Sequence, residues 1–159
     1  MDVIEKAIRG ALEKGDADDR AFREKVYRSA FAALERALQA NPDLAPEIAG
    51  KRRSDLQAKI AEMPDEDRAL AARIHEIVTT TVPDLVPRTF YGMPAYAKNG
   101  KVVCFFQAKA KFKVRYSTLG FQHDARLDEG EIWPVAFAVT SLTPAGEKQI
   151  AELVKKAAG

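Results

Sequence analysis

The sequence has few of the residues on which catalytic and structural metal sites usually depend. It holds one cysteine, Cys104, and two histidines, His75 and His123. A single cysteine excludes an intrachain disulfide framework and a cysteine-ligated zinc site. No G-x-S-x-G, P-loop or G-x-G-x-x-G motif occurs. Because no nucleophile–base pair can be written down, we expect a protein without enzymatic activity.

Long apolar runs and a charge imbalance are also missing. No unbroken apolar run is longer than Val102–Phe106, whereas a membrane span needs about 20 residues. The first ten residues carry charges where a secretion signal would be apolar. We therefore expect a cytoplasmic protein that does not associate with membranes. With 25 basic and 23 acidic side chains, the net charge is +2, and a role in nucleic-acid binding is not expected.

Apolar residues make up 47% of the chain, enough for a hydrophobic core. Their periodicity divides the chain into a helical N-terminal extension, 1–62, and a second domain, 63–159. One helix of the extension begins near Asp18 or Asp19 and ends at Asn41-Pro42. Its apolar stripe could engage a protein partner or a second copy, and it consists of Phe22, Val26, Tyr27, Ala30, Phe31, Leu34 and Leu38. Another helix is predicted from Pro46 to Met63, with Ile48, Leu56 and Ile60 inward.

The second domain begins as a helix and continues as strands. Pro64 suits a helix start, and the buried stripe of that helix is Leu70, Ile74, Ile77 and Val78. Asn99-Gly100 predicts a type I′ hairpin. Further strands are expected over 111–117 and 133–139, before a last helix that starts at Thr143-Pro144. This order predicts an α+β fold, an antiparallel sheet of about four to five strands packed against helices.

An acidic loop follows the predicted third strand. It contains His123, Asp124, Asp128, Glu129 and Glu131. Oxygen ligands with one imidazole suit hard or borderline divalent cations, including iron(II). The spacing matches no calcium-loop template, and the same acids could simply solvate a surface loop. Asp65, Glu66 and Asp67 have a structural explanation of their own, since acids in a first helical turn complement the helix dipole.

Four cations alternate with apolar residues in the predicted strand, namely Lys109, Lys111, Lys113 and Arg115. On a continuous strand they share one face, which could bind an anionic ligand, phosphate or nucleic acid. Lysines also protect edge strands from aggregation, so the row could equally be an edge-strand device.

An unusual cluster of residues precedes the hairpin. In Tyr91-Gly92-Met93-Pro94-Ala95-Tyr96, Gly92 allows a backbone conformation closed to other residues. Pro94 predicts an edge position or a bulge. Tyr91, Met93 and Tyr96 could line a ligand pocket together with Trp133, or could pack as a kinked entry strand.

Several of these strings together resemble the YdhG-like domain family, over about residues 55–158. They are Tyr91–Tyr96, Gly100–Phe106, Leu127–Pro134 and Glu62–Arg68. The resemblance implies an α+β fold of helices against one antiparallel sheet. Some family members are described as frataxin-like intracellular iron chaperones, which implies carboxylate ligands along the first domain helix. Here those carboxylates are Asp65, Glu66, Asp67 and Glu76, interrupted by Arg68 and Arg73.

Two functional hypotheses follow. The first is a non-enzymatic protein that binds a metal ion, with iron(II) as the named ion, or a small ligand. The second is a protein-interaction module whose basic strand binds an anionic ligand or nucleic acid. Charge reversal of the basic strand discriminates the two, because it should abolish only the second activity.

Overall fold

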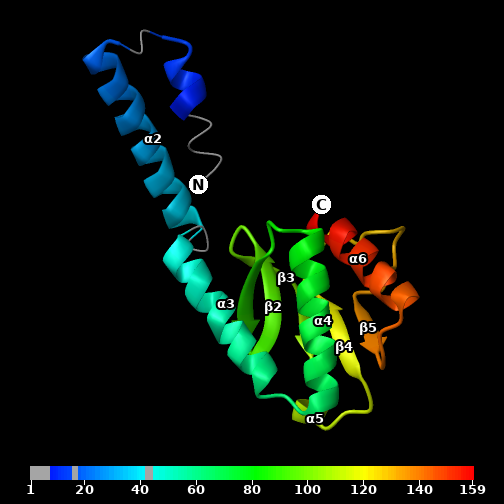
Figure 1. Ribbon diagram of the computed structural model, residues 1–159. Coiled ribbons are helices and arrows are strands. Elements are labelled where there is room, and N and C mark those ends of the chain that lie inside the picture. The colour runs from blue at the N-terminus through cyan, green and yellow to red at the C-terminus, as the bar shows by residue number, and fades with distance from the viewer. Residues whose placement is uncertain (1–7, 16–17, 42–44) are drawn as a thin grey trace. The chain divides into compact units, whose positions relative to one another are not determined.

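The computed structural model describes residues 8–15, 18–41 and 45–159 and divides the chain into two compact units, Met1–Ala45 and Pro46–Gly159. The first unit contains α2 (Arg20–Ala40). The second unit contains, in chain order, α3 (Pro46–Ala61), α4 (Asp65–Thr81), β1 (Val86–Phe90), β2 (Met93–Lys98), β3 (Lys101–Gln107), α5 (Lys109–Phe112), β4 (Ser117–Phe121), β5 (Ala136–Val139) and α6 (Pro144–Ala158) (Figure 1). The predicted α+β fold with a helical N-terminal part is confirmed.

Helix α2 begins and ends at capping residues. The Asp19 side chain accepts a hydrogen bond from the Ala21 amide at 2.9 Å, as the preferred N-cap residues do. The Asn41 amide donates to the Ala37 carbonyl at the other end. The predicted start and end of this helix are therefore confirmed. Across the described residues, no helix has both the length and the apolar character that crossing a membrane requires.

Helix α3 belongs to the same compact unit as the sheet. Leu56 and Ile60 are both buried in the core of that unit. Ile48, also predicted to point inward, is exposed. The compact unit therefore begins at Pro46, because α3 packs against the sheet and beside α4. The boundary that apolar periodicity predicts, at 62/63, would separate α3 from these elements.

The sheet is an antiparallel meander in the order β1-β2-β3-β4-β5. Two tight turns connect its first three strands. Tyr91 and Gly92 have φ angles of 49° and 72°, and Asn99 and Gly100 have φ angles of 52° and 78°. A type I′ turn requires positive φ at both central residues, so the predicted hairpin at Asn99-Gly100 is confirmed.

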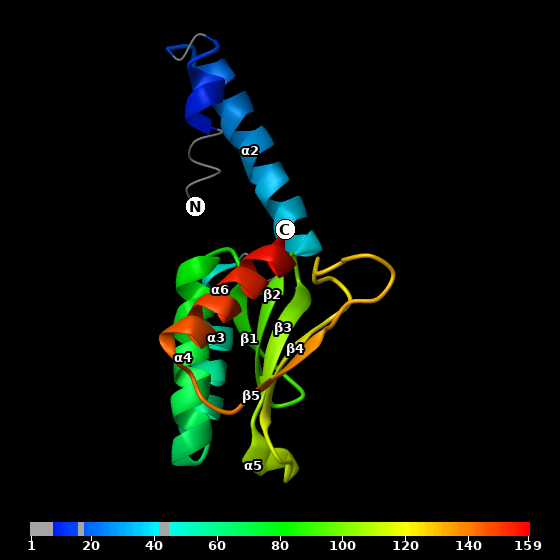
Figure 2. The same ribbon diagram turned by 90° about the vertical axis from the view of Figure 1, so that its right-hand side faces the viewer.

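All three long helices of this unit lie on one side of the sheet (Figure 2). The register pairs Tyr96 with Cys104, Cys104 with Phe121, and Phe106 with Leu119. Directly paired residues share a face, so these five side chains lie together on the face that contributes to the core. Val103 of β3 and Val139 of β5 also belong to the core. The helices contribute Leu56, Ile60, Ala71, Ile74, Ile77, Val78, Ile150 and Val154. Leu70, the remaining member of the predicted stripe, is only partly buried against this core.

The prediction of a strand over 111–117 is wrong. Residues Lys109–Phe112 form the short helix α5, Lys113 follows with a φ of 52°, and β4 starts only at Ser117. A buried carboxylate on α4, that of Asp67, accepts hydrogen bonds from the Ala110 amide and the Ser117 hydroxyl, both at 3.1 Å. These tertiary contacts override the strand-like alternation of the sequence.

Two predicted details near the other strands also differ. The strand expected over 133–139 is shorter and begins at Ala136. Pro94 does not lie at an edge, because β2 is hydrogen-bonded to β1 on one side and β3 on the other. Pairing with β3 starts at Ala95, beyond the proline, and the irregularity in register falls between Tyr96 and Ala97.

Candidate functional site

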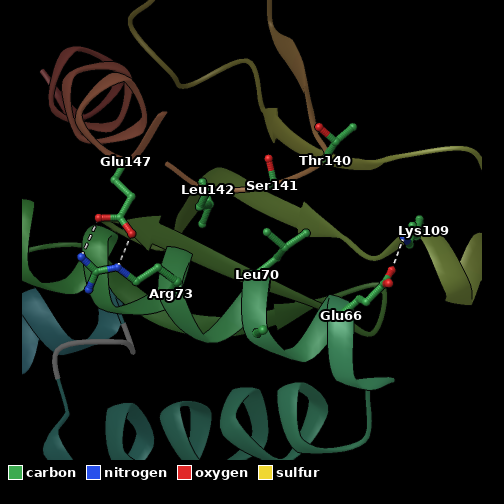
Figure 3. A pocket seen from close by; sticks show the side chains of 9 residues that line it. Glu66, Leu70, Arg73, Lys109, Thr140, Ser141, Leu142 and Glu147 are labelled. Carbon is green, nitrogen blue, oxygen red and sulfur yellow. Dashed lines mark hydrogen bonds and ion pairs between the residues drawn. The ribbon is translucent and has the colours of Figure 1, made fainter. Parts of the chain in front are cut away.

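A cavity of about 500 Å³ lies between α4, the start of α5 and the connection from β5 to α6 (Figure 3). Two ion pairs stand at its ends, with Leu70 and Leu142 between them. The hydroxyl groups of Thr140 and Ser141 lie along one wall. The complete lining is Glu66, Ala69, Leu70, Arg73, Lys109, Thr140, Ser141, Leu142 and Glu147.

The first ion pair joins α4 to α6. Arg73 Nε donates to Glu147 Oε1 at 2.7 Å, and Arg73 Nη2 donates to Glu147 Oε2 at 2.8 Å. Parallel hydrogen bonds of this kind fix the orientation of both groups. The hydrogen bond from Arg73 lowers the pKa of the Glu147 carboxyl, and those to Glu147 and Glu76 raise the pKa of Arg73. The pair thus stays charged at neutral pH.

The second ion pair joins α4 to α5. Lys109 Nζ donates to Glu66 Oε2 at 2.6 Å. This hydrogen bond lowers the pKa of the Glu66 carboxyl and raises the pKa of the Lys109 ammonium. The Glu66 side chain is 78% exposed, so a polar ligand can reach and compete for this pair.

A partly buried and a buried hydrogen bond in series hold the Lys109 backbone in place. The Lys109 amide donates to Ser117 Oγ at 3.1 Å, and that hydroxyl donates to the Asp67 carboxylate. Glu147 is positioned by the start of α6, where the Thr143 side chain accepts a hydrogen bond from the Gly146 amide at 3.2 Å. Each end of the cavity is therefore anchored by a hydrogen-bonded helix start.

The structure does not bring the predicted metal ligands of α4 together. Asp65 pairs with Arg68, Glu66 with Lys109, and Glu76 with Arg73 at 2.6 Å. Asp67 is buried and accepts the hydrogen bonds that hold α5. Among the residues that the structure describes, no three His, Cys, Asp or Glu side chains are grouped so that they could hold a metal ion.

The acidic loop is similarly divided. Asp124 pairs with Lys101 at 3.2 Å and Glu129 with Lys156 at 3.1 Å. The other predicted ligands of this loop, His123, Asp128 and Glu131, are exposed. Between them, Ala125 and Leu127 are buried in the core, which explains why a loop so rich in charge keeps a defined course.

The predicted aromatic pocket does not form as one site. Tyr91 is 84% exposed in its turn, whereas Tyr96 is fully buried. Met93 is buried, and it lies three positions from Tyr96 in β2. Side chains alternate between the two faces of a strand, so these two residues point to opposite faces. Trp133 is partly buried against the core on the far side of the acidic loop.

The four predicted anion-binding cations do not form a row on a sheet face. Lys109 lines the cavity, while Lys111 donates to the Gly92 carbonyl at 3.1 Å. Lys113 and Arg115 are exposed in the loop that leads from α5 to β4. The Arg115 guanidinium lies 5.3 Å from the centre of the Tyr116 ring.

Four polar residues that line the cavity were not predicted as site residues from the sequence, namely Arg73, Thr140, Ser141 and Glu147. The sequence does place Glu147 in the first turn of a helix that starts at Thr143-Pro144. Its partner on α4 is 74 positions away, and no local pattern indicates such a pairing. Comparisons with protein-family models, with curated proteins and with solved structures found no match to this chain.

Proposed function

We propose that this protein binds a small polar ligand without transforming it, and that the ligand occupies the cavity between α4, α5 and the β5–α6 connection. The observation that supports this most directly is the pair of anchored ion pairs at the two ends of one cavity. Ligand pockets typically combine an apolar lining with a few placed polar groups. Here Leu70 and Leu142 supply the apolar part.

The charges of the cavity favour a ligand that carries both signs. Arg73 and Lys109 are balanced by Glu66 and Glu147, so the lining has no net charge. A multiply charged anion would meet two carboxylates, which oppose its binding. A zwitterion with a short apolar body, such as a small amino acid or a betaine, can offer a carboxylate to one end and a cation to the other.

A non-enzymatic role is consistent with the chemistry of the groups present. The acid and base groups of the cavity are engaged with each other in ion pairs. The thiol of Cys104 is buried in the core, and burial raises its pKa to about 12, which leaves it protonated at neutral pH.

Iron handling, implied by the resemblance to YdhG-like proteins, is the other form of this hypothesis. Its support is weaker, because each α4 carboxylate already has a cationic or hydrogen-bonding partner. An ion that recruited Asp65, Glu66 and Glu76 would have to break three ion pairs. Anaerobic iron(II), with magnesium as the hard-cation control, therefore belongs in the same binding experiment.

The test is amide NMR with glycine betaine, alanine, acetate and methylammonium as probes. We expect the zwitterions to shift amides of 66–73 and 140–147, and the singly charged probes to do so at least about tenfold more weakly, equivalent to about 1.4 kcal/mol. Ala69→Phe fills the cavity from the exposed side of α4. Ala72→Phe adds the same ring on the same helix outside the cavity lining and serves as the control.

Binding should be lost in Ala69→Phe and retained in Ala72→Phe. Shifts that survive in Ala69→Phe would place the ligand elsewhere, and indifference to all four organic probes would contradict the proposed ligand class. Selective broadening of the Asp65–Glu76 or His123–Glu131 amides by iron(II) would favour the metal hypothesis instead.

A second candidate function is supported by residues 112–116, which are the last residue of α5 and the loop that leads from it to β4. Phe112, Val114 and Tyr116 are 41%, 45% and 37% exposed, beside Lys113 and Arg115. Exposed apolar side chains interleaved with cations suit an acidic protein segment that also carries apolar residues. We infer that this loop is the interaction surface, in place of the sheet face expected from the sequence.

A labelled peptide of alternating Glu and Leu is a suitable probe, with poly-glutamate and oligouridylate as competitors. Lys113→Glu with Arg115→Glu should abolish its binding. Lys148→Glu with Lys155→Glu makes the same charge change on α6 and should not. Equal losses in both variants would indicate a general charge effect, and tighter binding of oligouridylate would indicate nucleic acid as the partner.

A further inference from the structure

Helix α2 carries an apolar seam that its own unit leaves largely open. Tyr27, Phe31, Leu34 and Leu38 follow one another at spacings of four, three and four residues. This is the heptad spacing of helices that pack side by side. Tyr27 is 52% exposed and Phe31 is 63% exposed, and none of the described residues of α2 is buried.

The preceding turn covers a different side of the helix. A Cβ atom added at Gly15 would lie 2.1 Å from the Phe22 ring, so this ring packs directly on the glycine. Phe22 is five and nine positions from Tyr27 and Phe31. At 100° per residue, these two side chains point about 140° and 180° away from it. The contact with Gly15 therefore cannot cover the seam.

A helix in this condition needs a packing partner. Isolated helices are marginal in water, and most of their stability in proteins comes from packing of the apolar face. With 21 residues, α2 is about 32 Å long. An equal helix laid along it could cover the whole seam.

Charges beside the seam indicate both the partner and its direction. In heptad notation, the seam consists of a positions, Phe31 and Leu38, and d positions, Tyr27 and Leu34. Arg28 and Glu35 each follow a d position and therefore both occupy e positions. An antiparallel pair of identical helices sets e against e, so Arg28 meets Glu35 of the partner subunit, twice by symmetry. A parallel pair sets g against e, which places Arg23 of the partner subunit beside Arg28.

We propose that α2 of one copy packs antiparallel against α2 of a second copy, so that the protein is a homodimer through its N-terminal helices. The seam of each α2 is thus covered by the seam of the other, and a two-fold axis relates the two helices. Two attractive Arg28–Glu35 contacts select this direction over the parallel one. This dimer is independent of the ligand cavity proposed above, whose lining begins at Glu66.

Charge exchange within the full-length protein tests the contact. Sedimentation equilibrium should give a dimer for the wild type and, for Arg28→Glu, roughly tenfold weaker dimerisation, since two attractive contacts become repulsive. Arg28→Glu with Glu35→Arg restores opposite charges and should restore the dimer. Lys25→Glu is the matched control, because Lys25 lies on the side of α2 away from the seam.

Direction is tested with spin labels on Lys25→Cys and Gln39→Cys. The native Cys104 is buried and has a pKa raised to about 12, so only the introduced thiols are labelled. The distance between two spin labels is measured for each variant alone and for a mixture of the two. An antiparallel dimer gives the shortest distance in the mixture, because position 25 then lies beside position 39 of the partner. In a parallel dimer the same two positions are about 21 Å apart along the axis, at 1.5 Å per residue.

Three results would overturn this interface. A wild-type protein that is monomeric at millimolar concentration would contradict the dimer. A shortest label-to-label distance in the samples of single variants would contradict the antiparallel direction. A charge-exchanged double variant that stays monomeric while circular dichroism shows wild-type helicity removes the Arg28–Glu35 contact. A monomer would instead indicate that the seam is covered within one chain or by another protein.

Discussion

The Nδ1 atom of His75 on α4 lies 3.1 Å from the hydroxyl oxygen of Tyr96 on β2. Tyr96 is fully buried beneath the helices, so His75 supplies the hydrogen-bond partner that its hydroxyl needs. Burial raises the pKa of Tyr96 well above its usual value, which keeps the phenol protonated. With Nδ1 unprotonated, the phenol donates to it, and the neutral imidazole is the form that suits this site.

Stability should therefore depend on pH through His75. Burial, and secondarily the nearby Arg53, lower the pKa of its imidazole. The unfolded chain, with an imidazole pKa of about 6.5, binds a proton more readily than the folded one. The free energy of unfolding should be at its full value above about pH 6.5 and should fall as pH drops through the folded pKa.

Urea unfolding at a series of pH values from 8 to 5 measures this dependence. His75→Gln cannot titrate and should flatten the curve between neutral pH and pH 5. His123→Gln is the control, because it removes the exposed histidine of the acidic loop. If both variants keep the wild-type slope, the carboxylates and not His75 set the acid sensitivity.

Asp67 should be the most costly carboxylate to remove. It is 1% exposed and accepts hydrogen bonds from the Ala110 amide and the Ser117 hydroxyl. Asp67→Ala leaves the buried Ser117 hydroxyl and the partly buried Ala110 amide without their acceptor. This should lower the unfolding free energy by about 2–6 kcal/mol, at about 1–3 kcal/mol for each orphaned group. Denaturant titration followed by fluorescence of the single tryptophan, Trp133, measures the loss.

Two variants show whether that loss comes from the buried contacts. Asp65→Ala removes a neighbouring acid that makes only an exposed ion pair with Arg68, and should change stability far less. Ser117→Ala removes one of the two donors, and its loss of unfolding free energy should lie between those of Asp67→Ala and Asp65→Ala. Equal effects of Asp67→Ala and Asp65→Ala would point to the helix dipole as the common cause.

The same carboxylate marks the limit of prediction from the sequence. Hairpins and helices whose signals are local were predictable, as Asn99-Gly100 and the start of α6 at Thr143-Pro144 demonstrate. Asp67 has a local explanation as a first-turn acid, and nothing nearby in the sequence reveals that it holds Ala110 and Ser117. The alternation of the basic segment alone therefore predicts a strand, which the contacts with Asp67 override.

The candidate site was less predictable for a related reason. Each ion pair of the cavity joins distant segments, Arg73 to Glu147 and Glu66 to Lys109. A single sequence contains the charges but not their pairing. The predicted metal site illustrates the consequence, because Asp65, Glu66 and Glu76 lie on one helix yet each is paired with a different cation.

Cys104 should report unfolding by its reactivity. The thiol is fully buried, and desolvation raises its pKa to about 12. A maleimide or disulfide reagent should leave it unmodified in native buffer at pH 7.5 and modify it rapidly in 6–8 M urea, where a thiol pKa is about 8.5. Fast modification in native buffer would show that β3 opens locally without global unfolding.

Replacement by alanine should change the unfolding free energy in opposite directions at two glycines, Gly120 and Gly50. A Cβ atom at Gly120 would lie 2.2 Å from the ring of Phe105, its direct cross-strand partner, whereas a Cβ atom at Gly50 in α3 would meet nothing within 4 Å. Gly120→Ala should cost about 1–3 kcal/mol of unfolding free energy by overpacking. Gly50→Ala should add up to about 1 kcal/mol by helix propensity.

The cause of the Gly120 effect can be isolated by a double-mutant cycle. Phe105→Leu shortens the side chain above the glycine, so Gly120→Ala should cost less in that background than in the wild type. Denaturant titrations of the four proteins give the coupling energy. Additive losses would mean that the methyl group strains the backbone of β4 and does not displace the Phe105 ring.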